Sequence, residues 1–134
     1  WEAFEQTRAV TDLYLYDIKH VEPGAHRTGT GRDNKRILRN LRRLSESGAA
    51  IGLRYVLLPG YNMDDDALRR LGELAGGLNL KSLELLAYHR LGAGKYTQLD
   101  RRSQWRDVEP PTGAQLAACR NRLLDLVACR VTVG

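Results

Sequence analysis

Four short segments rich in β-branched, aliphatic and aromatic residues recur along the chain, and helical patterns separate them. The segments span Thr11–Lys19, Ala50–Leu58, Ser82–Ala87 and Arg130–Val133. The first three begin about 30 to 40 residues apart, the length of one strand–helix unit. This alternation predicts an α/β fold with a parallel sheet, right-handed crossovers and outer helices. Three and a half units are too few for a closed eight-stranded barrel, so we expect either a small open sheet or part of a barrel.

Helices are predicted between these segments because apolar residues return there every three or four positions. The pattern covers Asn34–Ser47 and Asp64–Ala75, and a last helix begins after Pro111. Thr112 and Gln115 have the spacing of a capping box at the start of that helix.

The length and composition favour one globular unit spanning residues 1–134. The chain has 134 residues and a formal net charge of +5, which permits an acidic partner without requiring one. No apolar run approaches the roughly 20 residues of a membrane helix, and no signal peptide is recognisable, so we expect no membrane association and a cytoplasmic location. The chain begins at Trp1, in what reads as the end of a helix over Trp1–Val10, and we therefore expect a piece of a longer protein.

Ionisable residues follow the carboxyl ends of the first three predicted strands. Strand alternation places Asp17 and Lys19 on one face of the first strand, with Arg54 and Glu84 on the same face of the next two, and His89 follows the third strand. Parallel α/β folds bind ligands at this end, and charges in a sheet are costly unless they are paired. We predict one polar cluster at the mouth of a pocket. In the alternative interpretation these are ordinary strand-end residues in solvent, with Arg54 and Glu84 as a structural pair.

Four linked motifs resemble the glycyl-radical enzyme activating enzymes of the radical S-adenosylmethionine superfamily. They are "LYDIKH" (15–20), "HRTGTGRDNKRILRNLRRLSESG" (26–48), "IGLRYVLLPGYNMDDD" (51–66) and "LELLAYHRLGAGKYTQL" (83–99). The resemblance covers nearly the whole chain. It implies a partial (β/α)6 TIM-like barrel, of which this chain is the carboxyl-terminal part.

The resemblance also implies a set of site residues. S-adenosylmethionine would be bound by Asp17, Lys19, Arg54, Val56, Leu86 and His89. Arg54 and His89 are the expected catalytic positions. Arg54 would lie near the cofactor and the incoming glycine-loop peptide, and His89 would contact the cofactor. Asp17 and the carbonyl of Leu15 are expected to bind a monovalent cation. His26, Thr28, Gly29 and Asn34 match a further family segment whose role stays open.

In the family a reduced [4Fe–4S] cluster cleaves the cofactor, and the resulting radical takes a hydrogen atom from a glycine of a partner such as pyruvate formate-lyase. Flavodoxin or ferredoxin is the expected electron donor. The family's Cys-x-x-x-Cys-x-x-Cys motif is absent here, where the two cysteines are Cys119 and Cys129. We therefore expect the amino-terminal cluster-binding part to be missing and this chain alone to be inactive. Ala87 also replaces the Pro that usually precedes Tyr-His in the family.

Other features have two interpretations each. Cys119 is expected to be a small buried hydrophobe. Asp64, Asp65 and Asp66 suit a helix start, with Mg²⁺ binding as the alternative. His20 and His26 lack a third metal ligand at helical spacing. The segment 28–31, "TGTG", suggests a turn, and Trp105 and Tyr96 either cap the site or pack.

The predicted helix over Asn34–Ser47 has a basic outer face. It consists of Lys35, Arg36, Arg39, Arg42 and Arg43. This face is either solvated or a docking surface for an acidic electron donor or the glycyl-radical partner. We do not expect nucleic acid binding, because no aromatic residues are interleaved with the charges.

Two competing functional hypotheses stay open. The first is a non-catalytic domain that retains the fold and binds a protein partner. The second is a radical enzyme of the same superfamily with a different substrate.

Overall fold

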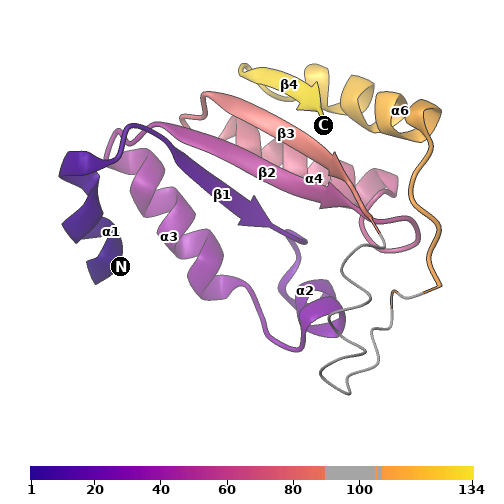
Figure 1. Cartoon of the computed structure of the whole chain (residues 1–134), viewed down its shortest axis with the longest axis horizontal. Helices are drawn as coiled ribbons and strands as arrows, with labels where there is room; N and C mark the ends of the chain where they lie inside the picture. Colours follow the sequence, from indigo (N-terminus) through magenta and orange to yellow (C-terminus); the bar gives the residue numbers. More distant parts are fainter. Residues whose placement is uncertain (90–104, 106) are drawn as a thin grey trace.

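The computed structural model describes residues 1–89, 105 and 107–134, which form one sheet with helices against it (Figure 1). In chain order the elements are α1 (Glu2–Thr7), the 3-10 helix η1 (Arg8–Val10), β1 (Tyr14–Ile18), α2 (Pro23–Thr30), α3 (Lys35–Glu46), β2 (Ile51–Leu57), α4 (Asp65–Gly76), β3 (Ser82–Ala87), α6 (Gly113–Leu124) and β4 (Arg130–Val133). The four strands pair in sequence order, β1-β2-β3-β4, and each pair is parallel. The predicted α/β class with a parallel sheet and outer helices is confirmed.

The predicted first strand is longer than the observed one. β1 spans Tyr14–Ile18, because pairing with β2 begins at Tyr14↔Ile51 and ends at Ile18↔Tyr55. Lys19 therefore lies just beyond the strand.

Helix α2 was not predicted. The expectation of a turn at "TGTG" (28–31) was wrong for residues 28–30, which are helical, and only Gly31 lies beyond the helix. Glu22 begins the helix, since its carboxylate accepts hydrogen bonds from the backbone N–H groups of Gly24 (2.8 Å) and Ala25 (2.5 Å). Pro23 then occupies the first helical turn, where its missing N–H costs nothing. Gly31 ends the helix with a φ of 81°, a conformation that favours glycine.

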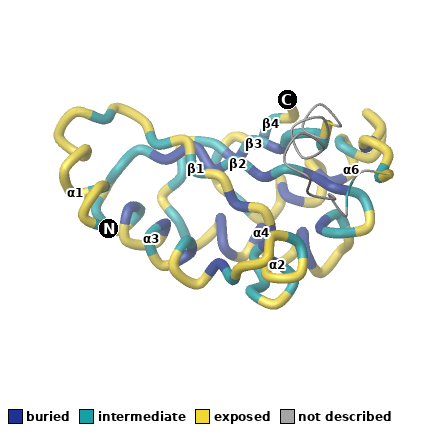
Figure 2. The backbone as a smooth tube through the Cα atoms, turned by 60° about the horizontal axis from the view of Figure 1, so that its bottom comes forward, coloured by how far each residue is buried: buried dark blue, intermediate teal, exposed yellow. Residues whose placement is uncertain are grey.

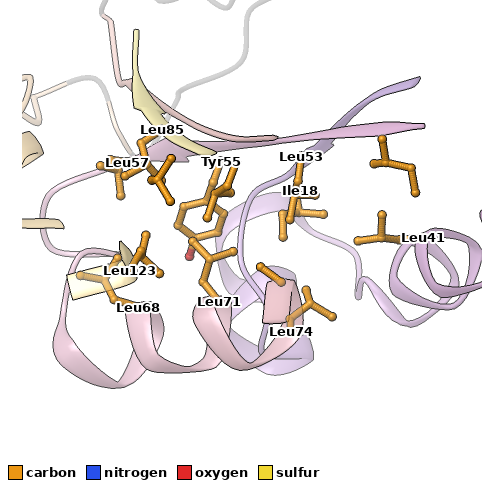
Figure 3. Packing of buried hydrophobic residues seen from close by; sticks show 14 of the residues in the cluster. Ile18, Leu41, Leu53, Tyr55, Leu57, Leu68, Leu71, Leu74, Leu85 and Leu123 are labelled. Carbon is orange, nitrogen blue, oxygen red and sulfur yellow. The ribbon is translucent and has the colours of Figure 1, made fainter. Parts of the chain in front are cut away.

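The hydrophobic core lies between one face of the sheet and helices α3, α4 and α6 (Figure 3). Its fully buried side chains include Leu41, Leu44, Ile51, Leu53, Tyr55, Leu57, Leu68, Leu71, Leu83, Leu85 and Leu123. Alternate residues of β2 and β3 supply the sheet side of this core, as the period of two in a strand requires. Cys119 is also buried in the core, which confirms its prediction as a small hydrophobe.

The opposite face of the sheet keeps its side chains half-exposed or exposed. Alternation along β1 turns Tyr14, Tyr16 and Ile18 toward the helices, while Leu15 and Asp17 face away. The Leu15 side chain is 61% exposed. Figure 2 shows β1 mainly in the colours of exposed and half-buried residues, whereas β2 is largely buried.

The three consecutive aspartates at the start of α4 serve the helix. Asp64 is its N-cap and accepts a hydrogen bond from the Ala67 N–H at 3.0 Å. Asp65 pairs with Arg122 of α6, and Asp66 pairs with Arg69 and Arg70. The helix-start interpretation is confirmed.

No helix in the described part of the chain is long and apolar enough to cross a membrane.

Candidate functional site

Three charged side chains form a row across β1, β2 and β3 on the exposed face of the sheet. Asp17 and Arg54 are direct neighbours in the β1–β2 register, and Arg54 and Glu84 are neighbours in the β2–β3 register. The Arg54 Nε lies 3.5 Å from Asp17 Oδ1 and 3.4 Å from Glu84 Oε2. The structure therefore brings together three members of the predicted polar cluster, and we call them the acid–Arg–acid row.

The contacts within this row are loose. Charge-assisted N–H···O hydrogen bonds are about 2.7–2.9 Å long, so both distances exceed that range. The Arg54 Nε is buried and has no hydrogen-bond partner among the described residues. The side chains of Asp17, Arg54 and Glu84 are 57%, 33% and 38% exposed. Such partial exposure keeps the net contribution of the ion pairs to stability small and leaves the carboxylates accessible to a ligand.

The next row toward the carboxyl ends of the strands is apolar. Val56 and Leu86 are direct neighbours in the β2–β3 register, and both side chains are half-buried. Lys19 follows β1 and His89 follows β3, and both are exposed. The structure thus places all of the predicted residues on one face or at one end of the sheet. Within the described residues, however, neither Lys19 nor His89 forms an ion pair with the row.

The ends of β1 and β2 are joined by Asn62, a residue that the sequence analysis did not single out. Its side chain is buried and makes three hydrogen bonds. Oδ1 accepts from the Leu58 N–H (2.8 Å), and Nδ2 donates to the carbonyls of Lys19 (2.9 Å) and Val56 (2.8 Å). Asn62 therefore determines where Lys19 and Val56 lie relative to each other. The only sequence signal was its place in the "LLPGYN" motif after a strand.

Two residues of the family segment without an assigned role, His26 and Asn34, form hydrogen bonds that hold the chain after β1. Asn34 is buried and donates from Nδ2 to the carbonyls of His20 (2.6 Å) and Val21 (3.0 Å). The imidazole of His26 is buried, with Nδ1 2.6 Å from the Arg32 carbonyl and 3.0 Å from Thr30 Oγ1. Both side chains satisfy polar groups that the turns around α2 would otherwise leave unpaired.

His20 is also engaged by the backbone. Its Nδ1 accepts a hydrogen bond from the Glu22 N–H at 3.0 Å, which requires the ring to be unprotonated at that nitrogen. Burial lowers the pKa of His20 from its ordinary value, against the opposing charges of Glu22 and Asp64. Among the described residues there is no group of three His, Cys, Asp or Glu side chains placed to hold a metal ion.

An aromatic cluster connects the loops that follow β1, β2 and β3. The Tyr61 ring lies 5.1 Å from the His20 ring and 4.8 Å from the Trp105 ring, measured between centroids. Trp105 Nε1 donates to the Gly29 carbonyl at 3.4 Å, and its own carbonyl accepts from the Tyr88 hydroxyl at 2.9 Å. Trp105 therefore packs between these loops, next to the residue that precedes His89. The Tyr96 prediction lies outside the described residues.

The two cysteines lie away from the acid–Arg–acid row. Cys119 is in α6, against the core on the helix side of the sheet, and Cys129 is half-buried before β4. Burial raises the pKa of both thiols, which disfavours the thiolate form that iron requires. These residues do not fit an iron–sulfur cluster.

Comparison with known proteins identifies the family. No protein family model matches the chain. The pyruvate formate-lyase-activating enzyme of Staphylococcus aureus strain USA300 is 41% identical over 109 residues, which are 81% of this chain and 43% of that protein. The enzymes of strains NCTC 8325 and MRSA252 match equally. The chain belongs to the pyruvate formate-lyase-activating enzyme family. It spans less than half the length of these relatives.

A solved structure agrees with the fold of this family. A domain of the pyruvate-formate lyase-activating enzyme of Bacteroides vulgatus superposes with a TM-score of 0.80, covering 99% of this chain and 73% of that domain. Its sequence is 23% identical, so the superposition supports the shared α/β architecture alone.

Proposed function

We propose that this chain supplies the S-adenosylmethionine-binding part of a radical activating enzyme that generates a glycyl radical on a partner enzyme such as pyruvate formate-lyase. Family membership supports the reaction class. The observation that carries the assignment to this face of the sheet is the acid–Arg–acid row, where a buried guanidinium nitrogen without a hydrogen bond lies between two accessible carboxylates.

The residues on this face fit the chemistry of S-adenosylmethionine, which carries an ammonium, a carboxylate and a sulfonium group. Asp17 would bind the cationic groups, and Lys19 and Arg54 would bind the carboxylate, through charge-assisted hydrogen bonds. Val56 and Leu86 offer half-buried apolar contacts, and His89 offers a further polar contact from the end of β3. Bound together with a reduced [4Fe–4S] cluster, this cofactor supplies hydrogen-atom abstraction. The protein then has to orient it against the glycine to be activated, a task we assign to Arg54 and His89.

A monovalent cation beside Asp17 fits the edge position of β1. The Tyr14 N–H donates to the Ala50 carbonyl, on the β2 side, at 2.9 Å. Backbone groups of successive strand residues point in opposite directions, so the Leu15 carbonyl points to the open edge of the sheet. That carbonyl and the Asp17 carboxylate are both hard oxygen ligands suited to such an ion.

We further propose that the cluster is bound by a separate part of the protein that completes the barrel along β1. Two observations support this. The chain spans 43% of its curated relatives, and the β1 edge presents exposed apolar residues, Leu13 and Leu15, on the cofactor face. This part would receive electrons from a flavodoxin or ferredoxin donor. The chain alone would then be inactive.

Binding of the cofactor can be tested by titration calorimetry with S-adenosylmethionine on the chain and on Arg54→Gln. Loss of a charge-assisted hydrogen bond is expected to weaken binding by at least about tenfold. Arg69→Gln, on the exposed side of α4, is the matched control and should bind like the wild type. Equal binding by the Arg54 variant would exclude this face as the cofactor site.

The proposal that a separate part of the protein binds the iron–sulfur cluster can be tested by reconstitution. Incubation of the chain with iron and sulfide should give no cluster absorbance, and a stoichiometric cluster would disprove the proposed division. The full-length parent should produce a glycyl radical on pyruvate formate-lyase, measured by electron paramagnetic resonance. Its Arg54→Gln variant should produce much less.

A further inference from the structure

Helix α3 is strongly basic, with five of the 21 Lys and Arg residues of the chain. Its exposed residues Lys35, Arg36, Arg39, Arg42 and Arg43 form its basic face, and Glu46 is its single acidic residue. The formal net charge of the helix is +4, whereas the other elements together nearly balance their charges in a chain of net +5. The apolar side of the helix is occupied in the core by Leu38, Leu41 and Leu44, which leaves the basic face pointing away from the protein.

The basic face has few acidic neighbours in the described part of the chain, and the charge of Asp33 acts on Lys35 at one end of it. None of its five residues forms an ion pair with a described residue. Arg43 instead places its guanidinium 3.9 Å from the centre of the Trp1 ring, a contact that keeps the charge. Lys35, Arg39 and Arg43 also follow one another at four-residue spacing, where like charges destabilise a helix.

The basic residues of α4 have the opposite arrangement. Arg69 pairs with Asp66 and Glu73, each at 2.5 Å, and Arg70 pairs with Asp66 at 2.6 Å. The same molecule therefore neutralises the arginines of one outer helix and leaves those of its neighbour unpaired. This difference favours an acidic partner on α3 over a uniformly solvated surface.

We propose that the basic face of α3 docks the acidic surface of a protein partner, and, resting on the proposed function, that this partner is the one-electron donor. Three features favour this partner: the size of the face, its lack of exposed aromatic side chains, and its position in the fold. The helix has 12 residues, or about 18 Å, which suits the small interfaces of transient electron-transfer complexes. The face offers no free aromatic ring on which a nucleobase could stack, because the ring of Trp1 is covered by the Arg43 guanidinium. Helix α3 also lies beside β1, the strand along which the cluster-bearing part would pair (Figure 1).

Binding of the full chain to immobilised flavodoxin tests this proposal with two double variants. Arg36→Gln/Arg39→Gln removes two charges from the basic face, and Arg69→Gln/Arg70→Gln removes two from α4 as the matched control. We expect the α3 variant to weaken binding about tenfold and to reduce its dependence on salt, because a docking charge contributes both to encounter and to affinity. The α4 variant should change binding less than about twofold, since its charges are already paired.

Three results would overturn the proposal. The first is equal weakening by both double variants, which would indicate bulk charge alone. The second is no binding of wild-type chain to flavodoxin. The third is tighter binding to a random-sequence DNA duplex that the α3 variant abolishes, which would make the face a nucleic-acid surface. Circular dichroism confirms that both variants fold. Calorimetry with S-adenosylmethionine on the α3 variant separates this proposal from the proposed function, because cofactor binding should be unchanged there.

Discussion

At the scale of single residues, buried polar and aromatic side chains hold the loops next to the candidate site. Asn62 joins the ends of β1 and β2, Asn34 holds the chain after β1, and Tyr61 packs between α2 and Trp105. The Tyr61 hydroxyl also donates to the Ala25 carbonyl at 3.0 Å. The hydrogen bonds of Asn62 position Lys19 and Val56 relative to each other.

Gly29 is the point in α2 where this packing leaves no room for a side chain. A Cβ there would overlap the Tyr61 hydroxyl and lie 2.5 Å from its Cζ. We expect Gly29→Ala to reduce the free energy of unfolding by about 1–3 kcal/mol, the usual cost of overpacking, in spite of the better helix propensity of alanine. Urea denaturation measures the change. Gly113→Ala is the control, because nothing lies within 4 Å of its Cβ, and it should be neutral or slightly stabilising. If both variants behave alike, the Tyr61 contact is not tight in solution.

His20 should make the stability of the protein depend on pH. Burial lowers its pKa below the ordinary value of 6.5, so the unfolded state takes up a proton at higher pH than the folded state does. The free energy of unfolding should therefore fall as the pH is lowered through about 6.5, and flatten below the folded pKa.

The carboxyl groups affect stability at a lower pH than His20 does. Glu22, Asp33 and Asp66 have pKa values lowered from their ordinary values of 4.5, 3.8 and 3.8, first by hydrogen bonds, so their contributions are lost only at more acidic pH. Unfolding experiments between about pH 7.5 and about pH 5.5 should show a smaller slope for His20→Asn than for the wild type. A wild-type slope in His20→Asn would show that another group is responsible.

At the scale of elements, helices α4 and α6 each begin with a capping side chain that is evident in the sequence. Asp64 caps α4, and Thr112 with Gln115 forms the predicted capping box of α6. The Thr112 Oγ1 accepts from the Gln115 N–H at 3.2 Å, and the Gln115 Oε1 accepts from the Thr112 N–H at 2.8 Å. These caps satisfy donors that a helix end would leave unpaired.

Removal of the α6 cap should be measurable. We expect Thr112→Ala to lower the free energy of unfolding by about 1 kcal/mol, because the Gln115 N–H loses its acceptor. Thr112→Ser retains the hydroxyl and should cost no more than a few tenths of that. Thermal and urea denaturation provide both values. A serine variant as unstable as the alanine variant would assign the effect to the lost methyl group instead.

At the scale of the whole molecule, the sheet is covered on one side. Helices α3, α4 and α6 bury one face, while among the described residues the opposite face and the β1 edge present Leu13 and Leu15 to solvent. Parallel sheets in α/β proteins are usually covered on both faces, and an uncovered edge favours association.

This asymmetry predicts that substitutions of two leucines on neighbouring strands differ strongly in their effect on stability. Leu15→Ser should change the free energy of unfolding by less than about 0.5 kcal/mol and should reduce concentration-dependent association in sedimentation velocity. Leu53→Ser, at a fully buried position facing the helices, should cost about 3 kcal/mol or more. Strong destabilisation by Leu15→Ser would mean that this face is covered in the folded chain.

The amino-acid sequence by itself determined the parts of the protein that depend on local periodicity. The period of two in "IGLRYVL" places Leu53, Tyr55 and Leu57 in the core and Arg54 on the other face. Because parallel strands align their carboxyl ends, the same pattern predicted that Asp17, Arg54 and Glu84 would meet. The caps of α4 and α6 were equally readable, since a cap and its helix are adjacent in the chain.

Only the tertiary structure decided the features that depend on contacts between distant segments. Helix α2 forms against weak local propensity because Glu22 caps it and Tyr61, over 30 residues later, packs on Gly29. The bridging role of Asn62 requires β1 and β2 to be side by side, and Trp105 reaches Gly29 across 76 residues. Likewise, composition shows how many arginines the chain has, but only the arrangement of helices shows which of them have an acidic neighbour. Electrostatic and packing energies depend on distances in space, which a linear pattern does not contain.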